Sequence, residues 1–76
     1  MTPADTARAM GLSLGDTIRG TQVWDGGWHE AELTLIWLGE HVCVWMERCR
    51  SYKKPDWSAA RETATWNVRQ RQWVRV

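Results

Sequence analysis

The sequence of 76 residues has no phenylalanine, one tyrosine, two prolines and two cysteines. Two cysteines cannot build the disulfide framework of small secreted domains, and the spacing of Cys43 and Cys49 fits no zinc motif. Six residues of extended strand would separate them by about 20 Å, whereas a disulfide needs Cα atoms within about 7 Å. We therefore expect two free thiols in a reducing, cytoplasmic setting.

Long apolar runs and phosphate-binding glycine patterns are also missing. No apolar stretch approaches the ~20 residues of a transmembrane helix, and no signal-peptide pattern opens the chain. Gly26 and Gly27 match neither the dinucleotide fingerprint nor the P-loop. We expect no membrane association and no nucleotide-dependent enzyme of these classes.

The residues that could support catalysis or bind a metal form no known signature. His41 and Cys43 fall on one strand face, but no third ligand lies at metal-site spacing, and no nucleophile motif surrounds Cys43 or Ser51. Glu30 and Glu32 share a face, as two catalytic carboxylates would, but such pairs on hairpins are usually solvated and often lie across from arginine. We therefore expect a protein that is not an enzyme and has no cofactor or metal.

Tryptophan is the abundant large residue, with seven copies. A chain this short buries only about 60% of its unfolded surface, which leaves little room for a catalytic pocket. Large aromatics bury ~150–250 Å² each, so several of them can form a small core without disulfides. We expect most of the tryptophans in the core and one or two exposed, because tryptophan is enriched at binding hot spots.

The first thirteen residues favour helix, unlike the rest of the chain. Thr2 followed by Pro3 is a good helix cap and first turn, the alanines favour helix, and Gly11 can end it. The segment has little bulk to bury. Residues 1–13 are therefore predicted to be a short N-terminal helix or a disordered leader.

From residue 14 the pattern is typical of β-structure. "LGDTIRGTQVW" and "HEAELTLIWL" flank "DGG" at 25–27, which predicts a hairpin with a glycine bulge, and a tight turn near 38–41 leads into "HVCVWMERCRSY". A connection at 53–65, with a short helical turn at residues 59–61, precedes a final strand at 66–76. The predicted class is mainly β: one domain, residues 14–76, forming a small antiparallel, strongly bent sheet or barrel of four to five strands, SH3-like or OB-like in size.

Alternation of side chains assigns faces to two of these strands. In the third strand Val42, Val44 and Met46 share an apolar face that we expect in the core. The opposite face, with Cys43 and Trp45, would then face solvent or line a site. In the last strand one parity holds Trp66, Val68, Val74 and Val76, a plausible core-closing set, and the other holds Arg69, Arg71, Trp73 and Arg75. A regular strand puts Trp73 outside, and a bulge would turn it inward.

Charge is divided unevenly along the chain. Residues 1–38 hold two basic and five acidic side chains, a net −3, whereas residues 39–76 hold eight basic and four acidic, a net +4. In "RCRSYKKPDWSAAR" basic residues surround two aromatics, a combination that contacts phosphates and stacks on bases. The candidate partner-binding residues are Arg48, Arg50, Tyr52, Lys53, Lys54, Trp57, Arg61, Arg69, Arg71 and Trp73. The alternative is a solvated basic loop with Trp57 packed over the mouth of the barrel.

Four stretches carry a resemblance: "GDTIRG" at 15–20, "LTLIWLGEHVCVW" at 33–45, "PDWS" at 55–58 and "ETATWNVRQRQW" at 62–73. Together they resemble small proteins of unassigned function encoded by bacteriophages and prophages, over about four-fifths of the chain. The shared motifs look structural and transfer no catalytic residue. The resemblance implies a small accessory protein, in the cytoplasm of a bacterial host, that acts by binding.

Three functions remain open on the sequence. The first is a non-catalytic accessory protein that inhibits or sequesters a host component, whether a host or defence protein or a signalling nucleotide. The second is a nucleic-acid-binding β-module, which the basic half of the chain favours. The third is a structural or assembly protein of the virion, which would form a defined homo-oligomer. The expected partner is thus a host protein or an anionic ligand, either a nucleotide or nucleic acid.

Overall fold

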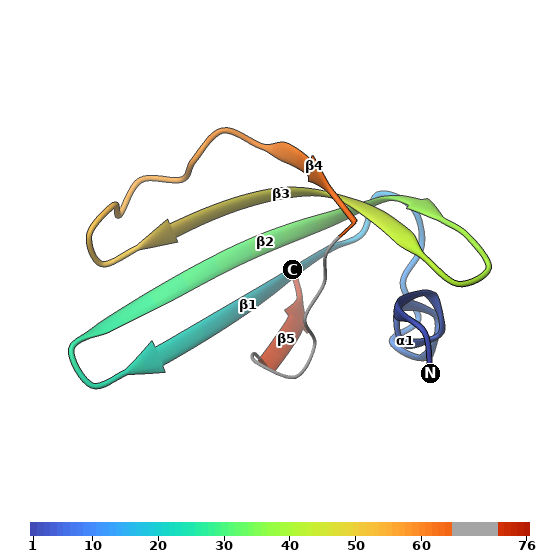
Figure 1. The fold of residues 1–76 in the computed structure, drawn as a ribbon, viewed down its shortest axis with the longest axis horizontal. Helices are drawn as coiled ribbons and strands as arrows, with labels where there is room; N and C mark the ends of the chain where they lie inside the picture. Colours follow the sequence, from blue (N-terminus) through green and yellow to red (C-terminus); the bar gives the residue numbers. More distant parts are fainter. Residues whose placement is uncertain (65–71) are drawn as a thin grey trace.

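A single antiparallel sheet dominates the computed structural model, which describes residues 1–64 and 72–76. Its spatial order is β4-β3-β2-β1-β5, and the short helix α1 lies near one end of the sheet (Figure 1). The prediction of a mainly β fold is confirmed; the sheet is strongly bent, and it is not closed into a barrel. The elements are α1 (Pro3–Ala9), β1 (Thr17–Trp24), β2 (Gly27–Leu38), β3 (Cys43–Ser51), β4 (Arg61–Thr63) and β5 (Gln72–Arg75).

The hairpin of β1 and β2 forms where the Asp-Gly signal predicts it. Trp24 pairs with Gly27, so the loop consists of Asp25 and Gly26 alone. Gly26 has a φ of 102°, a conformation that favours glycine. Because Gly27 is already paired within β2, the predicted glycine bulge is absent.

One face of the sheet, here called the inner face, carries the core. Its buried residues from the strands are Ile18, Leu33, Leu35, Cys43 and Trp45, and Ala7 and Leu12 pack on them from the N-terminal segment. The prediction that Val42, Val44 and Met46 form the core was wrong, since Val42 is 52% exposed and Trp45 on the opposite parity is fully buried. Burying an indole removes far more apolar surface from water than burying a valine.

A β-bulge near the end of β2 changes which side chains point outward. Leu35 pairs with Trp45 and Trp37 with Val44, so the register shifts by one residue between Leu35 and Trp37. Two consecutive side chains, Ile36 and Trp37, are consequently 40% and 51% exposed. Leu38 returns to the inner face and packs against the core. Strict alternation along β2 does not hold beyond this point.

The N-terminal segment is a docked helix. Thr2 caps α1 through its side chain, which accepts from the amide of Asp5, and Pro3 occupies the first turn, as predicted. Ala4 and Ala7 are fully buried, since small side chains let the helix approach the sheet closely. The Ala4 amide donates to the carbonyl of His41. The Arg8 guanidinium donates to two further carbonyls of the β2–β3 turn, those of Gly39 and Glu40.

Residues 52–60 connect β3 to β4 with bends at 52–54 and 56 and no helical turn, so the predicted helical turn at 59–61 was wrong. The amide of Ser58 donates to the carbonyl of Cys49, and the Ser58 hydroxyl accepts from the Cys49 amide. These bonds hold the connection along the edge of β3, and Arg61 already belongs to β4. Proline in the segment and edge pairing with β3 both favour extended backbone over a helical turn.

The C-terminal strand β5 has the opposite parity to the regular prediction. Trp73 packs against the core from the inner face, whereas Val74 and Val76 are exposed, so Val74 and Val76 do not close the core. Four residues assigned to this strand from the sequence, Trp66, Val68, Arg69 and Arg71, lie outside the described residues.

Candidate interaction face

The face of the sheet opposite the core, here called the outer face, carries rows of paired charges. The first row crosses three strands, where Arg19 on β1 pairs with Glu32 on β2, and Glu32 pairs with Arg48 on β3. The Nε atoms of Arg19 and Arg48 donate to the two carboxylate oxygens of Glu32, at 2.9 and 2.7 Å. Directly opposite residues in antiparallel strands project on the same side, so the register itself builds this row.

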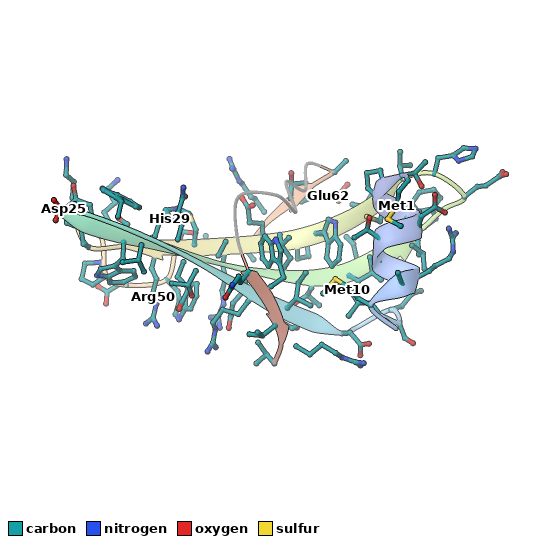
Figure 2. The ribbon with its side chains drawn as sticks, turned by 90° about the horizontal axis from the view of Figure 1, so that it is seen from below. Met1, Met10, Asp25, His29, Arg50 and Glu62 are labelled. Carbon is teal, nitrogen blue, oxygen red and sulfur yellow. The ribbon has the colours of Figure 1, made fainter. Side chains whose placement is uncertain are left out.

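A second row runs parallel to the first. Thr21, Glu30 and Arg50 are opposite one another on the same three strands. Arg50 Nε donates to Glu30 Oε1 at 2.9 Å, and the Thr21 hydroxyl donates to Glu30 Oε2 at 3.1 Å. Figure 2 shows His29 and Arg50 on opposite sides of the ribbon, as their opposite parity requires.

In both rows the glutamate side chains are buried beneath the arginine side chains. The side chains of Glu32 and Glu30 are only 6% and 13% exposed, whereas those of Arg19, Arg48 and Arg50 are 39%, 45% and 35% exposed. Burial alone would raise the pKa of Glu32, but the hydrogen bonds and charges of its two arginines outweigh burial and hold that pKa below its usual value. Solvent on this face therefore meets guanidinium groups rather than carboxylates.

Tryptophan rings lie against two of these guanidinium groups, those of Arg48 and Arg50. The Trp57 ring lies 4.5 Å from the Cζ atoms of both Arg48 and Arg50, and Arg50 is also 5.7 Å from the Trp28 ring. The connection after β3 thus places Trp57 on the outer face, and the predicted alternative of a plug over a barrel mouth does not apply to an open sheet. We name Arg19, Glu30, Glu32, Arg48, Arg50, Trp28 and Trp57 together the Arg–Trp stack.

The remaining candidate residues lie elsewhere. Tyr52 packs over Gly27 and contacts the Trp24 ring edge-on, with centroids 5.9 Å apart, and Lys53 lies 5.8 Å from the Tyr52 ring, so these two form a separate group at the hairpin end. Lys54 is exposed in the same connection, and its backbone turns back to Ser51.

Arg61 and Trp73 are not part of the stack either. Arg61 is opposite Glu47 in the register and forms an ion pair with it at 3.1 Å, on the parity of Leu33 and hence away from the stack. Trp73 belongs to the core, and Arg69 and Arg71 lie outside the described residues. Of the ten predicted residues, the structure therefore brings Arg48, Arg50 and Trp57 together.

The sequence pattern did not indicate Arg19 or Trp28 as members of this group. It indicated that Glu30 and Glu32 are usually solvated and often lie across from arginine; they do lie across from arginine, but they are largely buried. A signal for the glutamates was present, because Glu30 and Glu32 alternate in one strand as Arg48 and Arg50 do in the next. The register of β2 with β3 decides that Glu32 is opposite Arg48 and Glu30 opposite Arg50.

The described residues hold no group of three or more side chains able to bind a metal ion, and both cysteines are free. Burial raises the pKa of the Cys43 thiol, which keeps it protonated and unreactive. No helix in this part of the chain is long and apolar enough to cross a membrane. Comparisons with protein-family models, curated proteins and solved structures find no match to this chain.

Proposed function

We propose that this chain is a non-catalytic, phage-type accessory protein that binds a host protein through its outer face and thereby inhibits or sequesters it. The observation that carries the proposal is the Arg–Trp stack on a sheet face that no helix of the described chain covers. Tryptophan and arginine dominate binding hot spots, and a stack already held in place loses little conformational entropy when a partner docks.

The charge balance favours a protein partner over nucleic acid. The three arginines of the stack are offset by two glutamates, which leaves a net charge of +1 over the whole group. Duplex DNA carries one charge per ~1.7 Å of its axis, and affinity for it grows with the number of phosphates neutralised. Because the glutamates offset two of its three positive charges, this face can neutralise few of the phosphates along a nucleic acid. It still offers stacked, partly exposed rings and guanidinium planes to a protein surface.

The test is capture from a bacterial lysate with matched variants. The full-length chain, Trp57→Ala, Arg50→Gln and Arg61→Gln would each be immobilised, and retained proteins quantified by mass spectrometry with and without nuclease treatment. Trp57→Ala and Arg50→Gln should reduce retention of a specific partner by at least about tenfold, as loss of a hot spot does. Arg61→Gln removes an equally paired arginine from a different site and should leave retention unchanged.

Two results would contradict the proposal. One is equal retention of every lysate protein by all four chains, which would leave the outer face without a role. The other is retention that disappears with nuclease, which would instead support the nucleic-acid-binding function. Circular dichroism of each variant before capture shows that any loss reflects the surface and not unfolding.

A further inference from the structure

We infer that the partner surface is acidic and carries an apolar side chain at one end, so that its carboxylates meet the Arg–Trp stack while the apolar group packs near the β2 bulge. This inference rests on the proposed function and specifies the chemistry of the partner. Two features of the outer face carry it: the guanidinium donors left over after internal pairing, and an exposed apolar patch on the same face.

The unused donors are defined by how each arginine binds its glutamate. Arg48 and Arg50 each direct Nε and Nη2 to a single carboxylate oxygen, and Arg19 does the same toward the other oxygen of Glu32. The Nη1 groups of all three form no hydrogen bond to another described residue. The glutamates and tryptophans fix the guanidinium planes, so the outer donors form a preorganised receptor for carboxylate oxygens.

The apolar patch lies at the other end of the outer face. It consists of Ile36, Trp37 and Val42, which are 40%, 51% and 52% exposed. Trp37 is opposite Val44, and Val44 has the parity of Arg48, so Trp37 and the stack share a face, with the exposed side chains of Ile36 and Val42 close to Trp37 in the sequence and the turn. The Trp37 ring is held against Gly39, where a Cβ atom would collide with it. Trp37 lies five positions beyond Glu32 in β2, which corresponds to roughly 17 Å along the strand.

These two features together disfavour the other occupants. A nucleic acid would neutralise few phosphates on a group with a net charge of +1, and neither Ile36 nor Val42 offers a ring on which its bases could stack. A second copy docked face to face would bring like guanidinium groups together if the two-fold axis passes through the stack, and would otherwise set charged groups against the apolar patch. An acidic protein segment with an apolar anchor satisfies both ends of the face.

Titration of the ¹⁵N-labelled full-length chain with synthetic peptides tests the inference. Three probes of equal length are needed: a Glu/Asp-rich peptide with leucines at one end, the same peptide with the leucines replaced by serine, and a Gln/Asn version that keeps the leucines. The indole N–H signals of Trp57 and Trp37 report on the two ends of the face, and those of Trp45 and Trp73 report on the core. Assignments come from single Trp→Phe variants.

The anchored acidic peptide should shift the Trp57 and Trp37 signals and leave those of Trp45 and Trp73 in place. Serine replacement should abolish the Trp37 shift and weaken binding several-fold, and the Gln/Asn peptide should bind at least about tenfold more weakly, because charged hydrogen bonds are about twice as strong as neutral ones. Arg48→Gln should weaken binding and Arg61→Gln should not.

Three results would overturn the inference. They are no shift with the acidic peptide at millimolar concentration, equal shifts with a DNA duplex of the same charge, and shifts that follow protein concentration alone and so report self-association.

Failure of this inference is distinguishable from failure of the proposed function. If a captured host protein depends on Trp57 but the acidic peptide does not compete with it, the proposed function stands and the acidic chemistry of the partner does not.

Discussion

The Trp73 indole lies against the backbone of Gly20, its partner in the register between β5 and β1. A Cβ atom at position 20 would come within 2.8 Å of the ring carbons Cε3 and Cζ3. Position 20 therefore needs glycine because the Trp73 ring occupies the space that a side chain would fill, and not because the backbone has an unusual φ angle. The gap above Gly20 is what lets Trp73 turn inward and join the core.

Gly20→Ala should destabilise the protein by about 1–3 kcal/mol, the usual range for overpacking, because the added methyl group must displace the Trp73 ring. Urea unfolding followed by tryptophan fluorescence measures the change. Gln22→Ala, at an exposed site two residues along the same strand, should change stability by less than about 0.5 kcal/mol. In a Trp73→Ala background the effect of Gly20→Ala should largely vanish; an unchanged effect would show that the two residues are not coupled.

Glu32→Gln should destabilise the fold by about 1–3 kcal/mol, because it leaves Arg19 and Arg48 without their shared carboxylate. The depressed pKa of Glu32 also makes this contribution depend on pH. The contribution is complete above the unfolded pKa of about 4.3, and it is lost as the pH falls through the lower folded value. The stability difference between wild type and Glu32→Gln, measured by urea unfolding, should therefore shrink from pH 7 toward pH 3.

The exposed carboxylate of Glu62 offers a matched control for that experiment. Glu62→Gln should change stability by less than about 0.5 kcal/mol at pH 7, as is usual for surface substitutions. A Glu32→Gln difference that stays constant between pH 7 and pH 3 would mean that ionised Glu32 does not stabilise the folded state.

Trp45 and Trp37 should respond very differently to the same substitution. Trp45→Ala removes a fully buried indole and should cost about 3–5 kcal/mol, enough to unfold a chain of this size. Trp37→Ala removes a half-exposed indole and should cost about 1 kcal/mol, the typical effect of a single substitution. Thermal unfolding by circular dichroism checks both, and similar losses would contradict the placement of the β2 bulge.

The two thiols should differ in reactivity. Cys43 is fully buried and its pKa is raised by burial, whereas Cys49 is partly exposed with its Sγ 3.8 Å from the Ser58 hydroxyl. A thiol reagent such as DTNB should therefore modify one thiol per native chain, identified as Cys49 by peptide mapping, and two thiols in urea. Cys49→Ser should abolish the native reaction; rapid modification of Cys43 in the native chain would contradict its burial.

Local sequence determined the identity of several elements. The cap of Thr2 and Pro3 encodes the start of α1, the Asp-Gly pair places the first hairpin turn, and the alternating segments specify an antiparallel sheet. These signals act through neighbouring backbone, so they can be recognised without knowing the rest of the structure. The basic segment that spans the end of β3 and the connection after it also indicated Arg48, Arg50 and Trp57.

The assignment of buried faces required the tertiary structure. In β3 both parities carry apolar side chains, so alternation distinguishes the two faces of the strand without saying which is buried. Docking of α1 and the approach of Trp73 over Gly20 decide in favour of Trp45. The β2 bulge then exposes Trp37, an outcome that depends on cross-strand register and that no local pattern encodes.

The same distinction applies to the interaction face. The sequence by itself determined a basic, aromatic segment and an acidic pair on a neighbouring strand. Only the tertiary structure decided that Glu30 and Glu32 lie beneath the arginines and that Trp57 folds back onto them. The physical reason is that ion pairs and ring stacking between strands depend on distances of a few ångströms, which are set by sheet register and by the path of the connection between β3 and β4.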